Sequence, residues 1–516
     1  MGGKSDIQTG WLPLIIVTLS IFTIVIDKTF LNVAISSLIR DLNTNIGTIQ
    51  IIIATYSLVM ASLMLIGGRL QNILGRKRTF LTGAGIYGVG TIVAALSINS
   101  TMLLLGWSIL EGVGAALMMP ATTSIISGSY NGERRAFALG ITSSMASGAG
   151  TIGPIIGGFL TTYYSWRYAF GLELIIIIII VLFSGEISRF PHTMKWADLN
   201  VVGAVNSALG IFLLVIGILL LNDPKNWNIG LISIIIGLIL LIIFYFNQKN
   251  RMDHNKQPLV DVSLFKDRSF TLANISRLIM NFTIGGVLFV IPVYLQTVLG
   301  ADPLTTGFAL IPMSVAIFIM SSAAGKLSTR IQTRYILAIG SMAAMAGSIY
   351  LSLIFNPYTT ILDMIPGILL LGVGMGIVFP HSANAIFSVA RRDQQPDASG
   401  IMNTGINLGS SLGTAVLGLI LILGSFGSFG LVLNNQTTIS APEHITGVQQ
   451  LFGKLELQNP GNNKEQKMLI YDKVNTMKLA FNVVSIILFI GLIMSLFIPP
   501  QKRKRKPSIG GVSTNI

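Results

Sequence analysis

The chain has 516 residues, of which 52% are hydrophobic and only 10% are charged, and its mean hydropathy is +0.73. Because a soluble domain carries about 25% charged residues, this composition predicts an integral membrane protein. The absence of cysteine excludes disulfides, cysteine-ligated metals and thiol catalysis. The formal net charge of +14 would favour nucleic-acid binding in a soluble protein, but here its meaning depends on membrane topology.

Hydrophobic stretches long enough to cross roughly 30 Å of hydrocarbon contain about 20 residues each. The sequence predicts about fourteen such spans, near residues 11–36, 47–68, 79–99, 102–126, 137–162, 167–187, 200–221, 229–247, 270–298, 304–324, 334–355, 361–389, 399–424 and 479–499. The first span is longer than the apolar region of a signal peptide, so we expect it to remain uncleaved.

Two segments are predicted to lie outside the membrane. Residues 248–269 form a basic linker, and residues 425–477 form a polar loop in which Val448 to Leu455 is expected to be an amphipathic surface helix.

The distribution of basic residues predicts the orientation of the spans. An even number of spans places both termini on one side, and roughly three quarters of the Lys and Arg residues outside the spans then lie on the side of the termini. This bias predicts a multi-pass protein of the cell membrane with both termini in the cytoplasm. The positive charge is therefore attributed to topology and to contact with anionic membrane lipid, and no nucleic acid is expected as a partner.

An internal repeat supports a plan of two bundles. Gly68-Arg69-Leu70 is echoed by Gly325-Lys326-Leu327, and in both copies a basic residue follows the glycine after eight or nine positions. We expect an N-terminal six-helix bundle at 1–190, two inserted transmembrane helices at 191–250, a C-terminal six-helix bundle at 251–500 and a basic cytoplasmic tail at 501–516. Repeated six-helix halves around a central site are typical of secondary transporters.

Two motifs carry a family resemblance. Residues 68–80 read Gly-Arg-Leu-Gln-Asn-Ile-Leu-Gly-Arg-Lys-Arg-Thr-Phe, and the fifth span contains a stretch at 148–158 with Pro154 among glycines. The first resembles the loop signature of the major facilitator superfamily, and the second is similar to the antiporter signature of its exporters. The chain as a whole resembles the fourteen-span drug/proton antiporter family of multidrug efflux proteins.

The resemblance implies particular site residues. The gating loop would use Gly68, Asn72, Gly75, Arg76 and Lys77, with Gly68 allowing a tight turn and the two cations lying at helix ends. The antiporter-motif helix would use Gly148, Gly153, Pro154, Gly157 and Gly158, with glycines admitting a neighbouring helix and proline bending the span. The same glycine spacing also occurs in ordinary packing between membrane helices.

This sequence departs from the family pattern at three positions. The family usually has Asp where this chain has Asn72, and its fourth span usually carries Arg and Gln where this chain has Ser108 and Glu111. A cation linked to proton transfer in relatives is therefore replaced by a hydroxyl group.

Ionisable side chains at membrane depth cost about 2.5–3.5 kcal/mol each, so they are candidates for function. The candidates for proton coupling or substrate binding are Asp27, Asn32, Glu111 and Arg277. Asp27 and Glu111 each lie about nine residues from the outer ends of their spans, which places both roughly 14 Å deep. The family fold implies that both face one central aqueous path. Alternatively, Asp27 is a structural acid bonded to a neighbouring Thr or to the backbone, and Glu111 supports a polar contact between helices.

Lys28 follows Asp27 in the chain. Successive helical residues point about 100° apart, so Lys28 need not be the partner of this acid.

The resemblance implies an all-α integral membrane protein with the major-facilitator-type fold, two six-helix bundles and two inserted central helices. It also implies a monomer that exports amphipathic, cationic drugs or toxic compounds in exchange for protons, by alternating access and without a cofactor. An exporter of an endogenous metabolite, lipid or peptide is the alternative within the family. A polytopic membrane enzyme or sensor is a further alternative, but the sequence shows no catalytic grouping or metal-ligand cluster, so no enzyme is expected.

Overall fold

The computed structural model describes residues 10–499, with gaps at 131, 189, 191–193, 328–330, 392–393 and 425–463. Throughout this described part the regular structure is helical, which confirms the predicted all-α class. The first helices are α1 (Leu12–Phe30), α2 (Ile35–Asp41), α3 (Ile46–Leu74), α4 (Arg76–Ala95), α5 (Ser100–Leu103), α6 (Gly112–Ser129), α7 (Gly132–Tyr163) and α8 (Arg167–Leu182). They are followed by α9 (Val201–Leu220), α10 (Trp227–Asp253), α11 (Arg268–Thr297), α12 (Pro303–Leu327), α13 (Thr333–Ile354), α14 (Ile361–Val389), α15 (Gln395–Gly424) and α18 (Lys464–Leu496).

The long helices match the predicted spans approximately. Among the described residues, twelve helical segments are long and apolar enough to cross a membrane. Helices α4 and α7, with 20 and 32 residues, are also long but do not belong to this set. The protein is therefore a multi-pass membrane protein whose number of long helices is close to the predicted number of spans.

Two predicted boundaries are wrong. The loop predicted at 425–477 ends earlier, because α18 already begins at Lys464, and its proposed helix at 448–455 lies outside the described residues. The basic linker predicted at 248–269 is shorter, because α10 continues to Asp253. Both helices extend into polar sequence, which hydropathy alone assigns to loops.

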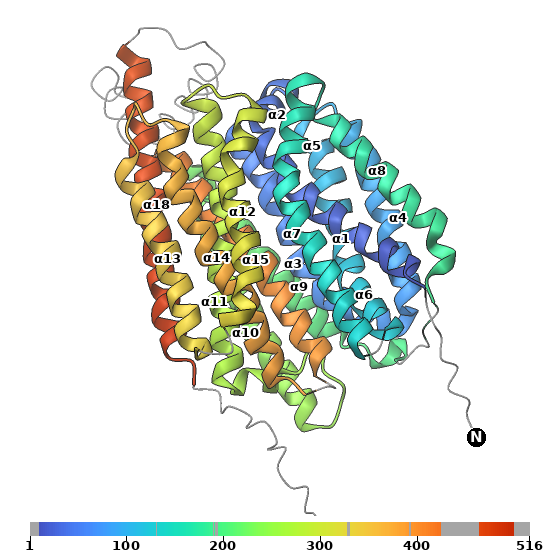
Figure 1. Cartoon of the computed structure of the whole chain (residues 1–516). Helices are drawn as coiled ribbons and strands as arrows, with labels where there is room; N and C mark the ends of the chain where they lie inside the picture. The colour runs from blue at the N-terminus through green and yellow to red at the C-terminus, as the bar shows by residue number, and fades with distance from the viewer. Residues whose placement is uncertain are drawn as a thin grey trace, which may run out of the picture.

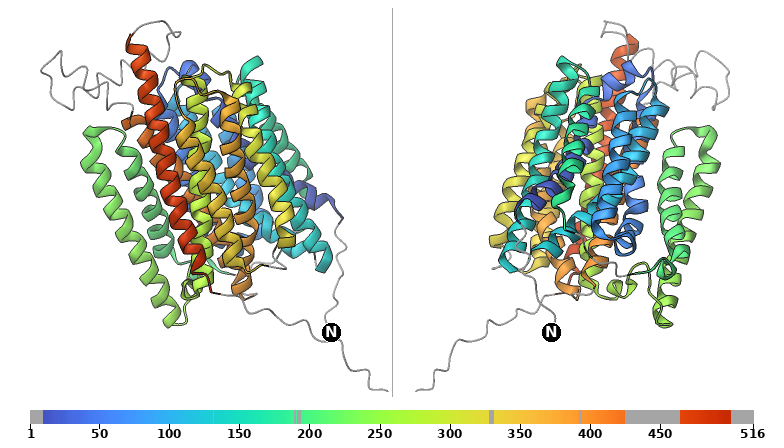
Figure 2. Two further views of the ribbon diagram at one scale, coloured as in Figure 1. Left: turned by 60° about the vertical axis from the view of Figure 1, so that its left-hand side comes forward. Right: turned by 90° about the vertical axis from the view of Figure 1, so that its right-hand side faces the viewer.

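The helices form two neighbouring groups (Figure 1). We name α1–α8 the N-terminal half and α11–α18 the C-terminal half. Helices α9 and α10 pack on each other, and α9 also contacts α3 of one half and α15 of the other. The pair stands beside the two halves (Figure 2). Only 11% of the most apolar stretch of α10 is buried, as expected for a helix that faces lipid.

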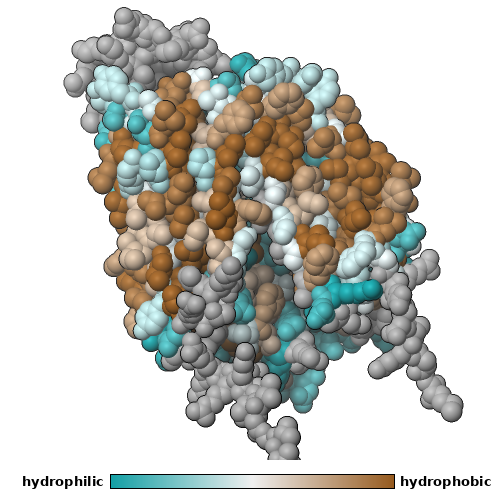
Figure 3. Space-filling view, viewed as in Figure 1, coloured by the Kyte–Doolittle hydropathy of each residue, from teal (hydrophilic) through white to brown (hydrophobic). Residues whose placement is uncertain are grey.

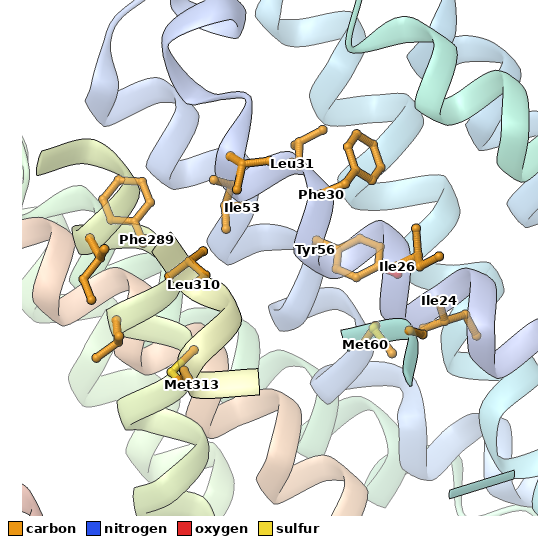
Figure 4. Packing of buried hydrophobic residues seen from close by; sticks show 14 of the residues in the cluster. Ile24, Ile26, Phe30, Leu31, Ile53, Tyr56, Met60, Phe289, Leu310 and Met313 are labelled. Carbon is orange, nitrogen blue, oxygen red and sulfur yellow. The ribbon is translucent and has the colours of Figure 1, made fainter. Parts of the chain in front are cut away.

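The first helix begins and the last helix ends at the same end of the molecule, which we name the terminal end (Figure 1). We name the other end the loop end. Buried apolar side chains from both halves belong to one continuous core, including Ile26 and Tyr56 of the N-terminal half and Phe289 and Leu310 of the C-terminal half. Figure 4 shows these side chains on facing helices.

One seam between the halves runs along α3 and α15. Near the loop end, Gln50 Nε2 donates to the carbonyl oxygens of Thr414 and Ala415, at 3.1 and 2.9 Å. Farther along, Ser411 Oγ donates to the Ala54 carbonyl at 2.8 Å. Lipid tails are as apolar as the helix surfaces, so the hydrophobic effect does not drive membrane helices together. Hydrogen bonds from side chains to the backbone of the other helix therefore contribute to holding α3 and α15 together.

The second seam joins α7 to α12, and it depends on glycine. A Cβ atom on Gly158 would lie 2.6 Å from the Pro303 carbonyl oxygen, and one on Gly307 would collide with the Pro154 carbonyl. The two backbones are therefore in direct contact in the part of the seam nearer the loop end. Toward the terminal end, Gly140 and Gly148 of α7 have open space at the position of a Cβ atom.

The molecule is hollowed on this face toward the terminal end, where hydrophilic side chains line the recess (Figure 3). The halves therefore meet near the loop end and separate along α7 and α12 near the terminal end.

The packing of α7 predicts opposite effects for two alanine substitutions. At Gly157 a Cβ atom would collide with Phe30 of α1, so Gly157→Ala should lower the free energy of unfolding by about 1–3 kcal/mol. At Gly148 there is open space, so Gly148→Ala should leave stability unchanged or raise it by up to about 1 kcal/mol through helix propensity. Thermal unfolding of the purified variants in detergent measures both. Equal shifts for the two variants would contradict the packing described here.

Candidate functional site

Three carboxyl groups meet inside the N-terminal half. Asp27 of α1, Glu111 and Glu173 of α8 are each fully buried, and one carboxyl oxygen from each lies within 4.8 Å of the other two. We name these three residues the acid cluster. It brings together groups that are far apart in the sequence, and like charges at this separation repel strongly in a medium of low dielectric constant.

A π-helical segment, η2 (Leu104–Glu111), positions one wall of the acid cluster. Glycines bring it close to α4: a Cβ atom on Gly90 would lie 2.6 Å from the Gly106 carbonyl oxygen and 2.8 Å from Glu111 Cγ. The wide turn of a π-helix shifts the register of the side chains that follow it, and such segments are frequent at functional sites.

Aromatic side chains surround the acid cluster. Trp107 Nε1 donates a hydrogen bond to Asp27 Oδ1, and the Tyr87 hydroxyl donates to Glu173 Oε2 at 3.2 Å. The Tyr56 ring stacks on the Trp107 ring with 4.9 Å between centroids and 5° between planes. These three aromatic residues are themselves fully buried, so the acids lie in a dry, apolar environment.

Five oxygen atoms of this site have no hydrogen-bond partner. They are Asp27 Oδ2, Glu111 Oε1 and Oε2, Glu173 Oε1 and the Tyr56 hydroxyl oxygen. Buried polar atoms without partners are rare, because each costs about 1–3 kcal/mol. The two ion pairs among the described residues, Arg69–Asp397 and Arg167–Asp41, both lie outside the acid cluster.

The expectation that Asp27 and Glu111 face a central aqueous path is wrong for this structure. Both side chains have 0% exposure and point into their own half. The alternative of a structural acid bonded to Thr or backbone also differs from the structure, because the partner of Asp27 is the Trp107 indole. The equal depth of Asp27 and Glu111 along their helices is consistent with the two acids lying close together. Depth does not determine the direction in which their side chains point.

Lys28, the next residue in α1, lies between the halves. Its Nζ donates to Asn407 Oδ1 of α15 at 3.2 Å, while its carbonyl accepts a hydrogen bond from Asn32 Nδ2 at 2.8 Å. Asn32 Oδ1 is buried without a partner. One helix thus carries an acid that faces inward and a neighbouring cation that contacts the opposite half.

Arg277 of α11 belongs to a different place. Its Nη1 donates to the Phe379 carbonyl and to Ser382 Oγ, both on α14, and its guanidinium group lies 5.4 Å from the centroid of the Phe379 ring. The structure therefore separates Arg277 from the acid cluster and places it between two helices of the C-terminal half.

The predicted gating loop also differs from expectation. Gly68 lies inside α3 and makes no turn; the chain turns at Gly75, whose φ is 90° and which separates α3 from α4. Arg76 Nη1 donates to the Ser124 carbonyl at 2.7 Å near the end of α6, as expected for a cation near a helix end. Lys77 Nζ contacts the Gly185 carbonyl at 3.4 Å.

At Asn72 of the predicted gating loop, the backbone makes a contact: its carbonyl oxygen accepts a hydrogen bond from the amide of Met194 at 3.1 Å.

Within the antiporter-motif helix, the glycines have separate partners. Gly153 and Gly157 face Thr29 and Phe30 of α1, while Gly158 faces α12. Pro154 contributes its carbonyl to the contact with Gly307, and Gly148 has no neighbour from another helix.

Sequence reasoning missed several contacts that the structure shows. Glu173, about six residues into the sixth span and beside a long run of Ile, was expected at the membrane interface, whereas the structure buries it in the acid cluster. The pair Arg69–Asp397, at 2.9 Å, had no local signal because its members are distant in the sequence. Arg69 Nε also donates to the Leu259 carbonyl at 2.6 Å, so it ties the segment before α11 to the seam.

Comparison with known proteins identifies the family of this chain. A family model described as Major Facilitator Superfamily matches residues 17–193 and 188–414. The chain belongs to the major facilitator superfamily, as the sequence motifs predicted, and it is a transporter of that kind.

Curated relatives with resistance names cover most of the chain. The Methylenomycin A resistance protein of Bacillus subtilis is 26% identical over 425 residues, which are 81% of this chain and 89% of the relative. The Methyl viologen resistance protein SmvA of Salmonella typhimurium is 29% identical over 415 residues, which are 80% of this chain and 82% of the relative.

Among solved structures, a bacterial homologue of the human lysosomal transporter Spinster, in an inward-facing and occupied conformation, is similar with a TM-score of 0.58. It is 15% identical and covers 94% of this chain and 96% of its own, which shows a shared fold.

The Arg69–Asp397 pair predicts energetic coupling across the seam. Arg69→Gln and Asp397→Asn should each lower the unfolding midpoint, and the double variant should be more stable than the sum of the single effects implies, by about 0.5–3 kcal/mol. A double-mutant cycle from thermal unfolding measures this coupling. Strict additivity would show that the pair does not hold α3 to α15.

Proposed function

We propose that this transporter exports amphipathic, cationic drugs or toxic compounds from the cytoplasm in exchange for protons, as a member of the fourteen-span drug/proton antiporter family. The observation that carries the proposal is the placement of Asp27 and Lys28 on α1: one joins the acid cluster and the next contacts the opposite half. The resistance names of the relatives support the substrate class.

Protonation would act through the charge of the acid cluster. Its three carboxyl groups lie in a dry interior without an ion-pair partner, so adding a proton relieves both repulsion and desolvation. Asp27 shares α1 with Lys28, and a shift of this helix changes the contact between Lys28 and Asn407 across the halves. Proton binding and the opening of the halves are then linked, and each biases the other by the same free energy.

The proposed orientation places the terminal end in the cytoplasm. The excess of basic residues on the side of the termini supports this orientation and a location in the cell membrane. The structure, which is hollowed near the terminal end, then represents a state with access from the cytoplasm.

In this arrangement the N-terminal bundle comprises 1–190, the inserted helices 191–250 and the C-terminal bundle 251–500. The protein works as a monomer in contact with membrane lipid.

One observation favours a second candidate for the substrate. Lys28 places a cation between the halves, where the contact with Asn407 leaves its positive charge without an ion pair. A positive charge at this position repels a cationic drug and attracts an uncharged or anionic compound. Export of an endogenous metabolite, lipid or peptide of that charge is therefore the second candidate.

Substitution of Asp27 tests the proposed coupling. Asp27→Asn keeps the size of the side chain but removes its titration, so transport against a concentration gradient should fall at least about tenfold while downhill exchange persists. Everted membrane vesicles that carry a pH gradient measure both activities. The matched control is Asp472→Asn, which alters a buried acid of α18 in the C-terminal half. Concentrative transport by Asp27→Asn at the wild-type level would refute the coupling role.

The charge of the substrate is tested in the same vesicles. A cationic dye such as ethidium should collapse the pH gradient if the first candidate holds, and Lys28→Gln should then increase the response because a repelling charge is removed. Collapse by uncharged or anionic compounds alone, with loss of the response in Lys28→Gln, would instead establish the second candidate. If neither cationic nor uncharged or anionic compounds collapse the pH gradient, both candidate functions are contradicted.

A further inference from the structure

The acid cluster has the chemistry of a cation site as well as that of a proton site. Carboxylate oxygens are the preferred ligands of hard metal cations, and Asp27, Glu111 and Glu173 each offer one within 4.8 Å of the others. Three atoms with such separations always have a common point within about 2.8 Å of each, while Ca²⁺ binds oxygen at about 2.3–2.6 Å. Small side-chain adjustments therefore suffice to bring all three into coordination.

A second observation points to a ligand. The Tyr56 hydroxyl is fully buried without a hydrogen-bond partner, and its ring stacks on Trp107, which itself bonds Asp27. Together with four unpartnered carboxyl oxygens, the site presents five free oxygen atoms from α1, α3, η2 and α8. The indole of Trp107 and the hydroxyl of Tyr87 occupy the other oxygens of Asp27 and Glu173, which leaves the free ones available.

The charges around the acid cluster also favour a bound cation. The ion pairs among the described residues lie elsewhere, and the neighbouring Lys28 points to Asn407. The titratable side chains that face one another here are the three acids with Tyr56 and Tyr87. Three ionised carboxyl groups carry a charge of −3, so Ca²⁺ together with one remaining proton, or Na⁺ together with two, would neutralise the acid cluster in an interior where isolated charges are costly.

We propose that the acid cluster binds a hard metal cation of the size of Ca²⁺ or Na⁺ through Asp27, Glu111, Glu173 and Tyr56. This inference extends the proposed function at the same site, because the cation and protons compete for the same oxygens. Mg²⁺ fits less well, since it requires near-octahedral ligands at about 2.0–2.1 Å and retains its water. No metal was expected from the sequence, in which Asp27, Glu111 and Glu173 lie far apart.

The test uses the purified full-length protein in detergent without substrate. CaCl₂, NaCl, KCl and MgCl₂ are added separately at constant ionic strength, which choline chloride maintains, and the unfolding midpoint is measured between pH 6 and pH 8. Ca²⁺ or Na⁺ should raise the midpoint saturably by at least about 2 °C. The rise should be larger at pH 8, because fewer protons compete. The absence of any rise beyond that of choline would overturn the proposal.

Variants assign the effect to the site. Glu173→Gln should lose the cation-dependent rise, while the control Asp472→Asn, at a buried acid of α18, should keep it. A full rise in Glu173→Gln would overturn the proposal. If that variant does not fold, wild-type protein suffices: Tb³⁺, which resembles Ca²⁺ in size, should luminesce when tryptophan is excited, because Trp107 adjoins the site. Ca²⁺ or Na⁺ should displace this signal, and luminescence that neither displaces would contradict the assignment.

Failure of this inference and failure of the proposed function are distinguishable. Proton-coupled export without a cation-dependent midpoint refutes only the cation site. A cation-dependent midpoint together with export that ignores the pH gradient keeps the site and refutes the proton-coupled function.

Discussion

Three carboxyl groups share a volume from which water is excluded, and most features of the N-terminal half follow from that constraint. In a medium of low dielectric constant, three negative charges within 4.8 Å cannot persist without neutralisation. The surrounding helices supply an indole N–H and a phenolic O–H, which satisfy two oxygens but add no positive charge. The compensating positive charge must therefore come from protons or cations that bind here, as expected if the acid cluster is the coupling site that we propose.

The position of α1 supports the proposed link between the acid cluster and the interface of the halves. Glycines of α7 pack directly on α1 at Thr29 and Phe30, two and three residues beyond Asp27, and Lys28 contacts α15 in the opposite half. Tightly packed helices shift as units and do not deform gradually, so we expect a change at Asp27 to reach the interface of the halves. The glycine contact between α7 and α12 near the loop end, with separation near the terminal end, provides the place where such a shift opens the molecule.

Much of this architecture was predictable from sequence. Apolar runs near 20 residues located the long helices approximately, and the motifs at 68–80 and 148–158 gave the superfamily. The predictions that were wrong concerned the position of a chain turn and the direction of buried side chains, and the contacts that were missed join segments distant in the sequence. Gly68 was expected to turn the chain, but Gly75 does so, since its backbone alone has a positive φ in that loop. Asp27 and Glu111 were expected to face water, because residue spacing gives depth and not the packing of neighbouring helices. The Arg69–Asp397 contact and the meeting of Glu173 with the other two acids required three-dimensional proximity that no local pattern encodes, although the position of Glu173 beside a run of Ile is itself visible in the sequence.

The proposed linkage between protonation of the acid cluster and substrate binding between the halves is tested most directly by proton release. Purified protein in weakly buffered detergent solution is mixed with ethidium while a pH indicator is monitored. The account predicts that substrate binding releases protons from the wild type and that Asp27→Asn, with the same amount of bound dye, releases at most a small fraction of them. Equal proton release by both proteins, or dye binding to the wild type with no release at any pH between 6 and 8, would contradict it.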